Sequence, residues 1–112
     1  MNDIFKKGDV LNMSQLIDYT KGGIVSKQII KNDAGDITLF SFDKEQGLSE
    51  HAAPFDAMLQ ILEGQAEVKI GAHPEIVKEG QTIILPANIS HSLFAIERFK
   101  MLLTMIKENP AV

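Results

Sequence analysis

Histidine and carboxylate side chains are the residues of this sequence that could carry chemistry, because the chain contains no cysteine. Its three histidines are His51, His73 and His91. Imidazole is the commonest metal ligand and also titrates near neutral pH, so two histidines in one cavity would suit either a divalent ion or proton transfer. His73 precedes Pro74 in a turn, and we expect it to be a solvated loop residue without a role. His51 and His91 therefore remain as the candidate histidines.

The elements that must position these histidines are short strands. From Ile24 onward, runs of β-branched and apolar residues alternate with Gly, Pro, Asn and Asp, a spacing typical of an all-β sandwich or barrel of six to eight strands. Residues 1–20 have a mixed pattern that leaves a helical turn or a short strand open. We predict one domain over 1–112, with an N-terminal arm at 1–22 and a barrel core at about 24–107. The predicted strands are 24–30, 37–42, 58–62, 66–70, 75–77, 82–85, 92–96 and 100–106.

Composition excludes several classes of partner. A chain of 112 residues with 45% hydrophobic and 23% charged residues can form one packed core. Its formal charge of −4 and the absence of a basic run argue against nucleic acid and anionic membranes as partners. No segment approaches the roughly 18 apolar residues of a spanning helix, and the N-terminus lacks the apolar stretch of a signal peptide. With no cysteine to form a disulfide, we expect a cytoplasmic protein.

Two stretches of the chain match a pair of known motifs. In the second stretch Asn stands where the motif has a glycine, a mild change because Asn tolerates the left-handed backbone conformation. The matching residues are Gly80, Pro86, Asn88 and His91 in the second stretch, and His51 and Gly64 in the first. Together the stretches span about 47–95 and resemble the two motifs of the cupin family. The resemblance to small single-domain cupins implies an all-β fold, the cupin-type double-stranded β-helix or jelly-roll barrel.

The resemblance also implies where a metal would bind and shows which ligands are missing. In cupins that bind metal, two His and a Glu from the first motif and one His from the second hold a divalent Fe, Mn, Ni or Zn ion. Here Ala53 and Ala57 replace the second His and the Glu, so only His51 and His91 carry over. Asp56 lies one residue before the ligand position, where a strand would turn it to the other face, although a looped segment would let it serve as third ligand. We therefore expect no tightly bound metal.

The two alanines leave a larger and less charged cavity. We predict that it binds a small, mostly apolar or aromatic molecule, with two neutral imidazoles as polar contacts. The role would be that of a sensor, carrier or regulator. An alternative is a cupin enzyme of the dioxygenase or isomerase type, with or without a metal, and a third is a barrel whose outer surface carries the function. The predicted ligand-binding residues are His51, Ala53, Phe55, Ala57, Leu59, His91 and Leu93.

Apolar residues on outward-facing positions predict a homodimer. Residues 101–106 are apolar on both alternating faces, so the second sheet, the N-terminal arm or another subunit should cover each side. If His91 and Leu93 face the barrel, Phe94 and Ile96 face outward. We expect a second copy of the chain to pack on such an outer sheet face.

Overall fold

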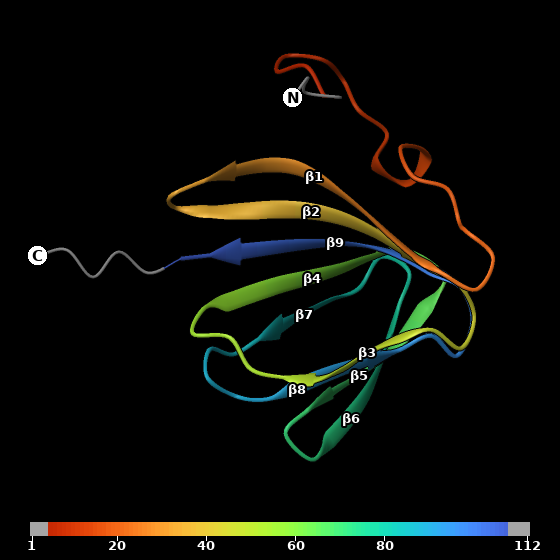
Figure 1. The fold of residues 1–112 in the computed structure, drawn as a ribbon, viewed down its shortest axis with the longest axis vertical. Coiled ribbons are helices and arrows are strands. Elements are labelled where there is room, and N and C mark those ends of the chain that lie inside the picture. The colour runs from red at the N-terminus through yellow and green to blue at the C-terminus, as the bar shows by residue number, and fades with distance from the viewer. Residues whose placement is uncertain (1–4, 108–112) are drawn as a thin grey trace, which may run out of the picture.

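The fold is seen in a computed structural model that describes residues 5–107. Within that range the chain forms nine strands and one short 3-10 turn (Figure 1). The elements are η1 (Met13–Gln15), β1 (Ile24–Asn32), β2 (Gly35–Phe42), β3 (Gly47–His51), β4 (Asp56–Glu63), β5 (Gln65–Ile70), β6 (His73–Lys78), β7 (Thr82–Leu85), β8 (His91–Phe94) and β9 (Phe99–Ile106). No helix in residues 5–107 has the length and apolar character needed to cross a membrane.

The strands form two antiparallel sheets that face each other. One sheet has the order β1-β2-β9-β4-β7 and the other has the order β3-β8-β5-β6. Figure 1 shows the two sheets stacked as layers, with the chain crossing repeatedly between them. This alternation between sheets is the jelly-roll arrangement, although hydrogen bonds do not close the strands into a continuous ring. The predicted all-β jelly-roll fold is confirmed.

Strand β3 is the element that the sequence prediction missed. It contains glycine, serine and glutamate, residues that favour turns or exposed loops over strands. Its position comes from pairing with β8, in which Gly47 lies opposite Phe94, Leu48 opposite Leu93, and His51 opposite His91. Tertiary pairing therefore overrides local preference here, and the strand count is nine instead of six to eight.

The core lies between the sheets and follows the predicted alternation of faces. Ala57, Leu59 and Ile61 of β4 are all buried, as expected for its inward set. Beyond the end of β4, the rings of Phe42 and Phe99 stack with their centroids 4.6 Å apart and fill one end of the barrel. The buried cluster consists of Phe42, Ala57, Leu59, Ile61, Ala66, Val68, Val77, Leu85, Leu93, Ala95, Phe99 and Met101.

The N-terminal arm covers part of the outer face of the five-stranded sheet. Ile17 of the arm is buried against it, with 1% of its surface exposed. Four neighbouring strands each contribute one polar contact to arm residues 14–19. The contacts are Lys27 Nζ to the Leu16 carbonyl at 2.7 Å, Ser41 Oγ to the Asp18 carbonyl at 2.8 Å, Lys100 Nζ to the Ser14 carbonyl at 2.5 Å, and the Tyr19 hydroxyl to Glu63. The arm thus covers part of the last strand, as one of the predicted alternatives stated. The far end of that strand is not covered, because Ile106 is 65% exposed.

Asn88 and Gly64 are among the turn positions that use the left-handed backbone region. Asn88 has a φ of 65°, so asparagine does take the conformation expected where the motif has glycine. Gly64, which ends the turn after β4, has a φ of 78°. A Cβ atom at Gly64 would lie 2.3 Å from the Arg98 carbonyl oxygen, so only glycine fits there.

Candidate functional site

Strand register brings His51 and His91 together. His51 ends β3, His91 begins β8, and the two residues are direct partners in the antiparallel ladder. Partners across a ladder project from the same face of a sheet. Their ring centroids lie 4.4 Å apart with the ring planes inclined at 64°. The two histidines singled out from the sequence therefore form one contacting pair.

The pair lies at the end of the barrel where β3 ends and β8 begins, which we call the mouth. The exposure of the side chains decreases from this mouth toward the core. His51 is exposed and His91 is half-buried, whereas Leu93, two residues further along β8, is 5% exposed. On the facing sheet Ala57 is 6% exposed, and Leu59 has no surface accessible to water. Within the predicted ligand-binding set, the accessible surface thus belongs mainly to the residues nearest the mouth.

Two loops frame this mouth. Ala53 and Phe55, both half-buried, lie in the segment that joins β3 to β4. The Asn88 amide, in the segment between β7 and β8, donates to the Ala53 carbonyl at 2.7 Å. The loop that carries predicted ligand contacts is therefore fixed to the loop that leads into His91.

A hydrogen bond constrains the His51 imidazole, and burial acts on the His91 imidazole. His51 Nδ1 lies 2.9 Å from the Ser49 carbonyl oxygen, which can only accept, so this nitrogen carries the proton. Nδ1 of His91 is buried and has no hydrogen-bond partner within the described residues. Burial lowers the pKa of His91, and the neighbouring His51 lowers it further. The backbone of Ile89 has a smaller effect in the opposite direction and raises the pKa of His91. His91 is therefore neutral at pH 7.

The carboxylates near the pair are engaged in other contacts. Asp56 is exposed, and its Oδ1 accepts from the Ala87 amide at 2.8 Å. Glu50 Oε1 accepts from Ser90 Oγ at 2.9 Å. Across residues 5–107, no three His, Cys, Asp or Glu side chains lie close enough together to hold an ion. The arrangement offers two imidazole nitrogens, fewer than the three protein ligands of a catalytic zinc or iron site, so it does not fit a closed metal centre.

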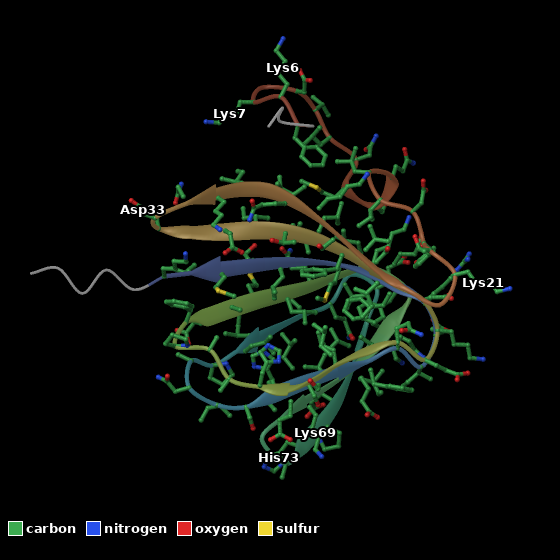
Figure 2. All side chains as sticks on the ribbon, in the orientation of Figure 1. Lys6, Lys7, Lys21, Asp33, Lys69 and His73 are labelled. Atoms are coloured by element: carbon green, nitrogen blue, oxygen red, sulfur yellow. The ribbon has the colours of Figure 1, made fainter. Side chains whose placement is uncertain are left out.

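His73 occupies the same row of the four-stranded sheet as the pair. His73 in β6 lies opposite Ile70 in β5, and Ile70 in turn lies opposite His91 in β8. His73 is exposed at the sheet edge, and Figure 2 places it at the end of the β5–β6 hairpin. The two-residue turn after Ile70 could have indicated this pairing from the sequence. Because His73 lies two strands away from His91, it serves best as a matched control.

A separate groove of about 340 Å³ lies between the N-terminal arm and the edge of β1. Its walls include Phe5 and Leu11 from the arm and Ile29 and Ile30 from β1. Lys6 and Lys7 belong to the same arm segment, and the side chain of Lys6 points away from the sheet in Figure 2. The groove lacks histidine and was not predicted from the sequence.

Comparison with known proteins places the chain in a family. No protein-family model matches the sequence, and no curated protein matches it. A conserved protein of unknown function from Streptococcus pyogenes is 38% identical, with 96% of this chain covering 94% of that one and a TM-score of 0.90. A cupin 2 conserved barrel domain protein from Leptotrichia buccalis is also 38% identical, over 87% of this chain and 47% of that one, with a TM-score of 0.84. The chain belongs to the cupin superfamily. A further cupin, from Desulfitobacterium hafniense, is 23% identical and shares the fold with a TM-score of 0.87, covering 96% of this chain and 97% of that one.

Membership in the cupin superfamily accounts for the position of the histidine pair. In this cupin, His51 and His91 lie opposite each other at the ends of the two strands that carry the matched motif histidines. The relatives named above give the fold and the family without a ligand or a reaction. The function must therefore be argued from the mouth itself.

Proposed function

We propose that this cupin binds a small organic molecule at the mouth of its barrel, with His51 and His91 as the polar contacts. The supporting observation is the contact between two imidazoles, 4.4 Å apart, at the border between solvent and the apolar core. Ligand sites combine an apolar lining with a few converging polar groups. The two imidazoles are the converging polar groups, and the residues around them supply the apolar lining.

The apolar part of the ligand would lie against the mouth side of the core. Leu93 and Ala57 present their small accessible fractions there, and Phe55 is half-buried in the adjoining loop. Alanine at positions 53 and 57 keeps both side chains short and uncharged. Because Leu59 has no accessible surface, the ligand sits above it and is not engulfed by the barrel.

A fragment screen with matched variants tests this proposal. Small organic molecules would be screened for thermal stabilisation of the wild type, then titrated against His51→Ala, His91→Ala and His73→Ala. We expect stabilising molecules to lose at least tenfold in affinity in the first two variants and to keep it in the third, because His73 lies on the same sheet away from the pair. The proposal fails if no molecule binds, or if the two mouth variants bind as well as the control.

We also propose that the protein is a homodimer formed through the outer face of the four-stranded sheet. Phe94 lies opposite Glu67, which lies opposite Ile76, so all three project from one face. Phe94, Ile76 and Ile96 are 44%, 42% and 40% exposed, and a second copy would bury them. Light scattering should give a dimer that Phe94→Ser weakens. Ile106→Ser, on the other sheet, is the control, and a monomeric wild type would refute the proposal.

A further inference from the structure

The arm is held on the five-stranded sheet mainly through its backbone. Three alternate carbonyl groups of the arm accept hydrogen bonds from side chains on the adjacent strands β1, β2 and β9. The donors are Lys27 Nζ at 2.7 Å from the Leu16 carbonyl, Ser41 Oγ at 2.8 Å from the Asp18 carbonyl, and Lys100 Nζ at 2.5 Å from the Ser14 carbonyl. Hydrogen bonds to a main chain do not depend on which side chains that main chain carries. The three donors therefore suit the backbone of any segment that follows the same path.

One apolar side chain of the arm is selected by the sheet. Ile17 is 1% exposed, whereas its neighbour Asp18 is exposed. Leu39 lies two positions before Ser41 in β2, so both project from the outer face that the arm covers. Leu39 has no exposed surface, so the arm shields it from water. A segment bound on this face therefore needs an apolar residue between its second and third accepting carbonyls.

Tyr19 is selected by a group of charged side chains. Its hydroxyl donates to Glu63, and the guanidinium carbon of Arg98 lies 4.5 Å from the centroid of its ring. Lys100 Nζ lies 5.1 Å from the same centroid. Burial and the hydrogen bond to Glu63 raise the pKa of the Tyr19 hydroxyl, so this group remains protonated and able to donate at neutral pH. Together these contacts require both an aromatic ring and a hydroxyl group.

The charges of this face also suit a backbone ligand. Its contacts come from three cations, Lys27, Arg98 and Lys100, and from the carboxylate of Glu63, although the whole chain has a net charge of −4. Lys100 is only 8% exposed, and its Nζ lies 3.8 Å from Glu63. A buried ammonium group is costly unless hydrogen-bond acceptors surround it. When the arm leaves, Lys100 therefore favours any segment that supplies a carbonyl in the place of Ser14.

We propose that this face is a peptide-binding site, which the arm occupies in the free protein. Its partner is a linear segment of another protein that carries an aliphatic residue and, two positions later, a tyrosine, as Ile17 and Tyr19 do in the arm. The arm competes with this partner, so the partner binds only when it displaces the arm. Because the site lies on the outer face of the five-stranded sheet, the inference is independent of the mouth and of the proposed dimer face.

A labelled peptide with the sequence of arm residues 12–20 tests this proposal. Its binding would be followed by fluorescence anisotropy with the full-length wild type and with full-length Ile17→Ser, a change that weakens the arm and leaves the sheet residues in place. We expect the peptide to bind Ile17→Ser at least tenfold more tightly than the wild type. A control peptide with serine at both positions 17 and 19 should bind at least tenfold more weakly than the arm sequence. Adding Lys100→Met to Ile17→Ser should also weaken binding about tenfold, whereas adding Lys69→Met, on the other sheet, should leave it unchanged.

Three results of this experiment would overturn the proposal. They are that the peptide does not bind a folded Ile17→Ser, that it binds the wild type and the variant equally, or that the control peptide binds as well as the arm sequence. If Ile17→Ser shows no cooperative melting, amide exchange in the wild type takes its place. Excess peptide should then accelerate exchange at residues 14–19, and unchanged exchange refutes the site. A wild-type dimer that Ile17→Ser dissociates would assign this face to the arm of a second copy, and the proposal of a different protein as partner would be wrong.

Discussion

Restoring the two missing donors should turn the histidine pair into a metal site. The double variant Ala53→His and Ala57→Glu would add an imidazole and a carboxylate at the positions where metal-binding cupins have ligands. Ala57 lies on the inward face of β4, paired with Leu85 and Met105, and is 6% exposed. A carboxylate at this position has little access to water. The stability of the variant therefore depends on whether a metal ion compensates the charge of this carboxylate.

The expected loss of stability follows from the burial of this carboxylate. Without metal, a buried and uncompensated carboxylate should lower the free energy of unfolding by about 3 kcal/mol. For a domain of this size that is a fall of roughly 12 °C in melting temperature. A divalent ion at a concentration 100 times its Kd returns about 2.7 kcal/mol, which offsets most of the loss. The variant should therefore be unstable in chelator and close to wild type in metal.

Differential scanning fluorimetry with zinc or nickel, and with EDTA, measures both states. The wild type has only two imidazoles to bind the metal. At a metal concentration equal to the Kd of the wild type for that metal, its free energy of unfolding should rise by only about 0.4 kcal/mol. Adding His91→Ala to the double variant should abolish most of the metal response. If the double variant responds to metal no more than the wild type does, positions 53 and 57 do not converge with the histidine pair, and the description of the mouth is wrong.

Three further predictions concern the pair, the arm and a turn. Because the pKa of His91 is lowered from 6.5 by burial, its neutral form stabilises the fold above that pH, and this stability is lost as pH falls toward the folded-state pKa. The melting temperature of His91→Gln should therefore depend less on pH below 6.5 than that of the wild type, and an unchanged slope would contradict this. Lys100→Met removes the charged hydrogen bond to the Ser14 carbonyl, worth about 1.5 kcal/mol or more, so amide exchange in arm residues 14–19 should accelerate about tenfold; unchanged exchange would show that this bond does not hold the arm. Gly64→Ala should lower the urea midpoint strongly, whereas Gly22→Ala, with similar φ but no neighbouring atom within 4 Å, should cost less; equal losses would refute the close contact with Arg98.

Much of the fold could be predicted because local patterns agree with the final packing. The inward alternation of β4 follows directly from strand periodicity, and so does the outward position of Phe94. Asn88 takes the left-handed conformation that its place in the motif requires. Strand β3 could not be predicted, because its pairing with β8 and not its own residue preferences makes it a strand.

The candidate site could be predicted only in part for a related reason. The resemblance to the two cupin motifs was enough to expect His51 and His91 to lie close together, and their ring centroids are 4.4 Å apart. The proton positions depend on main-chain groups such as the Ser49 carbonyl, which leave no trace in the sequence. Likewise, the contacts of Asp56 with Ala87 and of Glu50 with Ser90 arise from loop conformations that residue types do not specify.

Chemical-shift mapping of a stabilising fragment tests the central claim most directly. Ring and backbone signals would be followed during the titration of the tightest fragment into the wild type. The account predicts that the largest changes occur at His51 and His91, with smaller ones at Phe55 and Leu93. Changes that centre instead on the groove between the arm and β1, at residues 5–11 and 29–32, would contradict it.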